Sequence, residues 1–444
     1  MDEELCLLSA TELKPRLQSG EIRALELAES CLARISEYEE TIKAWTYINP
    51  DHVRAQAIAL DEYRQSGATI GPMHGLPVGL KDIIDTKDMP TENGTQADSG
   101  RVPREDAVLV KELKAAGALI MGKTVTWELA HNQRGKTKNP RDPNRTPGGS
   151  SSGSAAAVAM GMVPLAVGTQ TGGSIIRPAS YCGVVGFKST HNLISTHGIF
   201  MGSHTLDTVG VFGRSVDDVA LISEAMAGYG PDTTLQPRPR PALVKTAKSA
   251  PPVQPTFALV RPPEWELAEA DMRDAFDEIN EALGSHADLV ELPTPFAKAS
   301  TIHKTISLVE LSKYGAKYAL NHSDAMSKEF LSNIEEGAAY TGRDYLTALD
   351  WVEILNAGLD EIFERYDAII TPAAAGEAPV GLEDTGNGAF SRLWTLCGTP
   401  TISLPLLTGS NGMPMGVQLV GPRGDDGRLL RTANWLMQFT AETE

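Results

Sequence analysis

The amino-acid sequence predicts an α/β fold in which helices pack on a central sheet. Segments with helical spacing alternate with short apolar runs along the whole 444-residue chain, a pattern typical of layered α/β proteins. The composition, with 41% hydrophobic and 22% charged residues, is that of a globular protein. The sequence contains no internal repeat and no apolar run of about eighteen residues, so no membrane-spanning helix is predicted.

The first half of the chain contributes N-terminal helices and the first strands. Two helices are predicted within 9–44, because Ser9 and Glu12 have the spacing of a capping box and apolar residues from Leu25 to Ile35 recur at helical intervals. The elements that follow are recognised by their local apolar pattern: a strand at 76–80, a helix at 106–116 and a strand at 118–121.

The second half begins with a Pro-rich segment, 231–255, which is expected to be extended. Strands lie on both sides of this segment and neither half has a self-contained pattern, so we predict one domain over 1–444. Its parts are N-terminal helices at about 9–45, a core at about 70–230 and a remainder at about 256–440. In the remainder we expect strands at 257–260, 366–370, 401–404 and 416–420, and helices at 262–283, within 307–365 and at 427–437.

Charge and cysteine usage exclude several classes of function. A net charge of −18 disfavours nucleic acid and anionic membrane surfaces as partners, because both require basic faces. The four cysteines lie far apart, so neither a disulfide framework nor a zinc site is indicated. Acidic residues occupy the place where a signal peptide would be basic. We expect a cytoplasmic protein with no cofactor or metal; a homodimer is compatible with the sequence.

One motif suggests a phosphate-binding loop. Gly117, Gly122, Lys123 and Thr124 satisfy its pattern, G-x-x-x-x-G-K-[ST]. The four residues between the glycines are Ala, Leu, Ile and Met, which favour burial over an open loop. Moreover, a helix end precedes Gly117 where a strand would be required. We interpret the segment as a glycine-capped helix running into a buried strand.

A second motif suggests the nucleophile elbow of α/β-hydrolases. Gly149, Ser151 and Gly153 satisfy G-x-S-x-G, with Ser151 as the nucleophile. An elbow requires a preceding strand, but 139–147 contains three prolines. None of the later histidines lies in a recognisable catalytic setting. This interpretation is therefore disfavoured.

A third interpretation treats two glycine-rich turns as one site. The first turn, 148–154, runs into a buried helix start at 155–160, where free N–H groups and hydroxyls are available. The second turn, 168–174, follows a strand-like run at 163–167. Its glycines allow backbone N–H groups to gather in a concave cluster, as an oxyanion hole requires.

These turns resemble the amidase-signature family, and the resemblance extends over nearly the whole chain. It implies a central, mixed, mostly parallel sheet covered on both faces by helices. It also implies a serine hydrolase that cleaves carbon–nitrogen bonds of linear amides. The matching segments are GLPVGLKD (75–82), TPGGSSSGSAAAVA (146–159), GTQTGGS (168–174), PASYCGVVGFK (178–188), LDTVG (206–210), YDAIITP (366–372), GTPTISLP (398–405) and GVQLVGP (416–422).

The resemblance also implies roles for individual residues. It places the nucleophile at Ser174, a bridging serine preceded by a cis peptide at Ser150, and the base at Lys81. The serines lie 24 residues apart, as in the family. Ser151 is implied as a supporting hydrogen-bond partner. The backbone N–H groups implied for the oxyanion hole are those of Thr171, Gly172, Gly173 and Ser174.

The implied chemistry is coherent, because a serine hydroxyl attacks only when a base takes its proton. Lysine is such a base when neutral, and burial can lower its pKa from about 10.4 toward about 7–8. The apolar run before Lys81 favours such burial. Two departures from the family stand beside Ser174: Gln170 replaces a common Asp, and Ile176 replaces an Arg, with Arg177 one place later. We expect Gln170 to bond the turn directly.

The sequence therefore predicts an amidase acting through an acyl-enzyme, with aryl esters, anilides and carbamates as further substrates. The alternative is the amidase subunit of a tRNA-dependent amidotransferase; the Gln170 and Arg177 departures and the rather short chain favour a stand-alone enzyme. Specificity is expected from 126–136, 191–204 and helices after residue 295. Trp127, Phe200 and Met201 line the substrate pocket or belong to the core.

Overall fold

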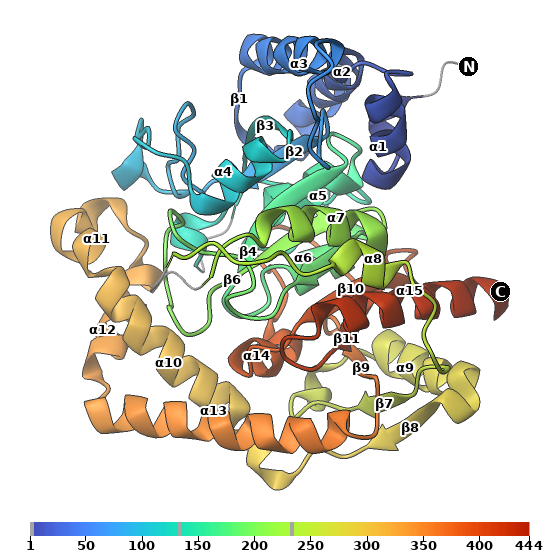
Figure 1. The fold of residues 1–444 in the computed structure, drawn as a ribbon. Coiled ribbons are helices and arrows are strands. Elements are labelled where there is room, and N and C mark those ends of the chain that lie inside the picture. The colour runs from blue at the N-terminus through green and yellow to red at the C-terminus, as the bar shows by residue number, and fades with distance from the viewer. Residues whose placement is uncertain (1–3, 132–134, 231–234, 444) are drawn as a thin grey trace.

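The computed structural model describes residues 4–131, 135–230 and 235–443, and its eleven strands form one sheet (Figure 1). In the order of the sheet, the strands are β1 (Trp45–Ile48), β3 (Leu119–Thr124), β2 (Pro77–Lys81), β4 (Leu165–Gln170), β6 (Thr208–Gly213), β5 (Val185–Lys188), β10 (Thr401–Thr408), β11 (Pro414–Val420), β9 (Ala368–Pro372), β7 (Phe257–Val260) and β8 (Ala287–Val290).

Fifteen α-helices surround this sheet in the described part of the chain. They are α1 (Ala10–Ser19), α2 (Ala24–Ile42), α3 (Pro50–Gln65), α4 (Val108–Ala115), α5 (Ser152–Ala159), α6 (Ile176–Cys182), α7 (Val216–Met226), α8 (Leu243–Ala247), α9 (Ala270–Leu283), α10 (Ala299–Tyr314), α11 (Ala316–Asn321), α12 (Lys328–Ala339), α13 (Gly342–Phe363), α14 (Ala389–Leu396) and α15 (Asp426–Thr443).

Helices cover both faces of the sheet, as the sequence predicts. Helices α5 and α6 contact each other and pack on β4, β5 and β10. Helices α7, α8 and α15 form a second contacting group, which packs on β6 and β10. The strands β2 to β6 are therefore buried at every position, which explains why they read as continuous apolar runs and not as alternating ones.

The sheet is mixed, but the expectation that it is mostly parallel is wrong. Parallel pairs occur toward the two ends, in β3–β2–β4 and β9–β7–β8. The edge strand β1 and the central run from β4 through β6, β5, β10 and β11 to β9 pair antiparallel. The connections explain the difference: helical crossovers give parallel neighbours, whereas the short turn 409–413 between β10 and β11 permits only an antiparallel pair.

Most of the predicted elements are confirmed. Ser9 caps α1 with a complete capping box. The suspected phosphate loop is a positive-φ Gly117 after α4, followed by the fully buried β3. One predicted helix begins later than expected, at Ala270, because 262–269 contains only a short 3-10 turn. The Pro-rich segment contains α8, and its residues 231–234 lie outside the described part.

Within the described residues, no helix combines the length and apolar character needed to cross a bilayer, and no cluster of three metal-ligating side chains is present. The four cysteines are buried and unpaired.

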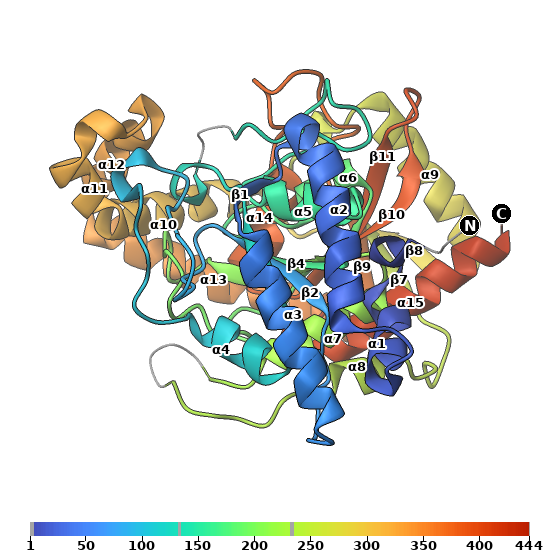
Figure 2. The same cartoon turned by 90° about the horizontal axis from the view of Figure 1, so that it is seen from above.

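A helical arm, α10 to α13, lies at one side of the molecule (Figures 1 and 2), and its helices α10 and α13 share a hydrophobic cluster with β7, β9 and β11. Helix α10 is its inner element, because it packs on α12, α13 and α14. Through α14, which leads directly into the central strand β10, this arm reaches the middle of the molecule.

Gly153, in the first turn of α5, lies so close to β3 that a Cβ would be 2.2 Å from Ala44 O and 2.3 Å from Val125 N. Gly153→Ala is expected to destabilise the fold by about 1–3 kcal/mol, because overpacking displaces backbone. The midpoint of urea unfolding measures this. Gly342→Ala is the matched control, since a Cβ at Gly342 would have nothing within 4 Å of it and alanine favours helices; equal midpoints for the two variants would contradict the prediction.

Candidate active site

Lys81 lies where two neighbouring parallel strands end. It is the last residue of β2, and Thr169 and Gln170 end β4. Lys81 Nζ donates to Ser150 Oγ and to Thr169 Oγ1, both at 2.8 Å. The carboxyl ends of adjacent parallel strands meet at one edge of a sheet, which is where open α/β sheets place their sites. The structure thus brings together Lys81 and Ser150, which are 69 residues apart in the sequence.

The environment of Lys81 favours its neutral form. The side chain is fully buried, and this burial lowers its pKa to about 7, opposed by the negative charge of Asp207. Desolvation disfavours the ammonium ion more than the amine. Both hydrogen-bond partners of Nζ are hydroxyl groups, which can donate as well as accept.

The turn that carries Ser150 precedes α5 and is held from several sides. The Gly149–Ser150 peptide is cis. Ser151 Oγ donates to Thr169 O at 3.1 Å and accepts from Thr169 N at 3.3 Å, so this turn is bonded to the end of β4. Arg177 Nη2 donates to Gly149 O at 2.5 Å. The ring of Trp127 packs on Gly149 so closely that a Cβ there would lie 2.4 Å from it.

Gln170 bonds the second turn directly, as expected. Its Oε1 accepts from Ile175 N at 2.8 Å and from Ile176 N at 3.1 Å. Its Nε2 donates to Thr395 Oγ1 of α14 at 2.9 Å. The expected turn begins later than predicted, because Gly168 to Gln170 belong to β4. A neutral amide thus closes this turn without a charged partner.

The turn 171–174 exposes a row of N–H groups. Its carbonyls are occupied: Thr171 O accepts from His303 Nε2 at 2.8 Å, Gly172 O from Thr395 Oγ1 at 3.0 Å, and Gly173 O from Arg177 N at 3.1 Å. Within the described part of the chain, the backbone N–H groups of 171–174 donate no hydrogen bond. These are the four groups that the resemblance implies for an oxyanion hole.

Ser174 is half-buried at the end of this turn. Its hydroxyl forms no hydrogen bond with any described residue, so the structure does not bring it into a hydrogen bond with Ser150. The hydroxyl of Ser150, by contrast, is already engaged with Lys81. The nucleophile assigned from the sequence is therefore the one member of the trio without a bonded partner among the described residues.

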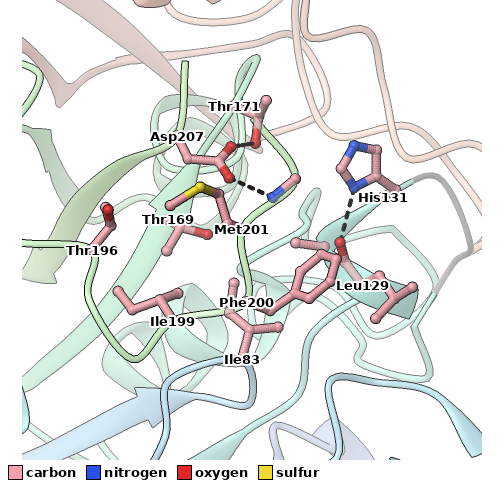
Figure 3. A pocket seen from close by; sticks show the side chains of 12 residues that line it. Ile83, Leu129, His131, Thr169, Thr171, Thr196, Ile199, Phe200, Met201 and Asp207 are labelled. Carbon is pink, nitrogen blue, oxygen red and sulfur yellow. Dashed lines mark hydrogen bonds between the residues drawn. The ribbon is translucent and has the colours of Figure 1, made fainter. Parts of the chain in front are cut away.

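A pocket opens beside Thr169 and Thr171 (Figure 3). Of the two alternatives expected for them, Phe200 and Met201 line this pocket, although Phe200 also packs against the core, whereas Trp127 does not line it and packs instead on Gly149. Of the segments expected to set specificity, 126–136 contributes lining residues only up to His131, and 132–134 lie outside the described part. The remaining lining is mainly apolar: Ile83, Leu129, Ala130, Ile199, with Thr196 and Gly202.

Sequence reasoning missed two polar groups of the pocket, Asp207 and His131. Asp207 accepts from Thr171 Oγ1 at 2.5 Å and from Gly202 N at 2.8 Å, and burial raises its pKa. Burial lowers the pKa of His131, whose Nδ1 contacts Leu129 O at 2.9 Å. Asp207 belongs to the LDTVG segment, which matches the family, but nothing in the sequence placed this residue beside Thr171.

The pocket wall is also tied to the helical arm. Glu310 of α10 accepts from Ser203 Oγ, from Thr205 N at 3.0 Å and Oγ1 at 2.5 Å, and from Tyr345 OH at 2.6 Å. These bonds fix the loop after Met201 between α10 and α13. This contact was not predicted either, because it joins residues more than a hundred positions apart.

Comparison with known proteins places this arrangement in a family. A family model described as Amidase matches residues 26–430. Curated relatives include a glutamyl-tRNA(Gln) amidotransferase subunit from Streptomyces coelicolor, 32% identical over 96% of this chain and 95% of that protein, and the protein of the same name from Symbiobacterium thermophilum, 33% identical over 97% and 96%.

Solved structures agree with the sequence comparison. An amidase is 31% identical with a TM-score of 0.86 over 97% of this chain and 99% of the other. The peptide amidase from Stenotrophomonas maltophilia is 28% identical with a TM-score of 0.84 over 98% and 97%. The chain therefore belongs to the amidase family, the amidase-signature enzymes that act on carbon–nitrogen bonds.

Proposed function

We propose that the chain is a serine amidohydrolase that cleaves linear amides through an acyl-enzyme on Ser174. The observation that carries this proposal is the fully buried Lys81, with a pKa of about 7, in hydrogen-bond contact with Ser150. A base whose pKa is close to neutrality is best suited to proton transfer at physiological pH.

The first step forms the acyl-enzyme, and protons move along the chain Ser174, Ser150 and Lys81. Ser174 Oγ attacks the amide carbonyl carbon while its proton passes to Ser150 Oγ, and the proton of Ser150 passes to Lys81 Nζ. The carbonyl oxygen becomes an oxyanion, which the free N–H groups of 171–174 stabilise. When the tetrahedral intermediate collapses, the C–N bond breaks and the leaving amine receives a proton from Ser150, which Lys81 reprotonates.

The second step uses the same groups with water as the nucleophile. Water passes a proton through Ser150 to Lys81 and attacks the acyl carbon. When this second tetrahedral intermediate collapses, the bond to Ser174 Oγ breaks, the acid leaves, and the proton returns from Lys81 through Ser150 to Ser174 Oγ. Esters and carbamates share the reacting carbonyl and a leaving group that needs a proton, so they are further substrates. The pocket with Phe200 and Met201 has room for about one water molecule, so an apolar part of the substrate would bind there only when these side chains move aside.

The second candidate function is the amidase subunit of a tRNA-dependent amidotransferase. It is favoured by the curated relatives, of which this chain covers 95–96%, so chain length does not separate the two functions. A fully active single chain on gel filtration supports the stand-alone enzyme. Activity that appears only with partner subunits supports the second candidate. The same experiment tests the homodimer, and cell fractionation tests the cytoplasmic location.

The catalytic trio is tested by substitution. Ser174→Ala and Lys81→Met are expected to lower kcat at least about a thousandfold, because either change removes a group that acts with the others as a unit. Rates with 4-nitroacetanilide, 4-nitrophenyl acetate and a 4-nitrophenyl carbamate measure the effect. Ser151→Ala is the comparison, with an expected loss below about tenfold. A larger loss in Ser151→Ala than in Ser174→Ala would restore the nucleophile-elbow interpretation.

The pH dependence follows from Lys81. Below its pKa of about 7 the ammonium form cannot accept a proton, so kcat/KM is expected to rise about tenfold from pH 5.5 to 6.5 and to level off near pH 8. Stopped assays with an uncharged anilide measure the profile.

Lys188 provides the control for this profile, because burial also lowers its pKa to about 7, while its partners among the described residues are the carbonyls of Ser189 and Thr399. Lys188→Met should keep the midpoint of the profile. If the midpoint moved in Lys188→Met, the titration would belong to Lys188 and the prediction for Lys81 would be wrong.

A further inference from the structure

Each carbonyl of the turn 171–173 is held by a different part of the molecule. Thr171 O accepts from His303 of α10, Gly172 O from Thr395 of α14, and Gly173 O from the backbone of Arg177 in α6. In a trans peptide the carbonyl and the following N–H point in opposite directions. A donor that fixes the carbonyl of one residue therefore fixes the direction of the next N–H.

We propose that His303 is a positioning residue of this enzyme: by holding Thr171 O, it aims the N–H of Gly172 into the oxyanion hole. The proposal rests on the proposed function, because it assigns a role to a side chain through that site. His303 is not expected to touch the substrate. It acts by fixing the orientation of the peptide between Thr171 and Gly172.

The state of His303 suits this role. The ring is buried and lies against the turn, with Cε1 3.8 Å from where a Cβ on Gly172 would be. Burial lowers its pKa to about 4, and the nearby Arg392 guanidinium acts in the same direction. The ring is therefore neutral at physiological pH. Because a carbonyl oxygen only accepts, the single ring proton of His303 is on Nε2.

Helix α10 carries both this contact and the anchor of the pocket wall. His303 and Glu310 are seven residues apart, which places them two turns apart on one face of the helix. One holds the oxyanion turn, and the other holds the loop after Met201 through Ser203 and Thr205. The helical arm thereby sets the distance between the reacting centre and the pocket wall.

The test distinguishes two roles of His303, the donation of a hydrogen bond and the packing of its ring. His303→Leu keeps the volume but removes the donor, and kcat for 4-nitroacetanilide is expected to fall about ten- to a hundredfold with KM nearly unchanged. His303→Gln retains an N–H that can reach the same carbonyl, and it should recover most of the loss. Ile306→Val is the matched control, since it removes a methyl group from a fully buried side chain of the same helix, and kcat should stay within about twofold.

The affinity for an inhibitor that forms a tetrahedral adduct is a second measurement, which a change in packing alone would not alter. The affinity for phenylboronic acid, which forms such an adduct with an active serine, should fall in His303→Leu by the same factor as kcat/KM. Unchanged kcat in His303→Leu, or an equal fall in Ile306→Val, would overturn the proposal. Labelling by a fluorophosphonate that is lost in Ser174→Ala tests the nucleophile separately; without such labelling the proposed function itself fails.

Discussion

The contact between Lys81 and Ser150 is the interaction on which the rest of the site depends. A lysine inside a protein is unfavourable as an ion and must keep its hydrogen bonds when neutral. The structure meets both demands by ending β2 and β4 at the same edge and by folding the turn before α5 over that edge. Ser150 and Thr169 then satisfy Nζ while excluding solvent from it.

Close backbone approach makes this arrangement possible. A Cβ at Gly149 would meet the ring of Trp127 at 2.4 Å, and one at Gly168 would meet Ser151 Oγ at 2.6 Å. Gly149 therefore lets the first turn pack against the ring of Trp127, and Gly168 lets β4 approach Ser151 of that turn. Arg177 secures the same turn through Gly149 O. Thus the charge that the family commonly places two residues after the nucleophile is found one residue later and bonds the neighbouring turn.

The sequence predicted those parts of the structure that depend on local pattern. The capping box at Ser9, the buried strand after Gly117 and the bond from Gln170 to its own turn each involve residues close in sequence. Strand direction was not predictable in this way, because it depends on how the chain returns to the sheet. His303 and Glu310 were not predictable either. They lie on a helix whose sequence marks neither of them as part of a site, and only tertiary packing brings α10 to the oxyanion turn.

Three buried lysines show why one of them is suited to catalysis. Lys123 lies 3.8 Å from the carboxylate of Asp82, and burial of this pair raises the pKa of Asp82 and lowers that of Lys123. Lys188 donates to two backbone carbonyls, which can only accept. Lys81 differs in that both of its partners are hydroxyl groups. A carboxylate would hold the proton on the lysine, and a carbonyl cannot pass one on. A hydroxyl can donate on one side while accepting on the other. Lys123 also has a hydroxyl partner, Thr91 Oγ1 at 2.7 Å, but the carboxylate of Asp82 lies beside it. Of the three lysines, Lys81 is the one whose partners are hydroxyl groups alone, so its proton can travel through Ser150 to the substrate.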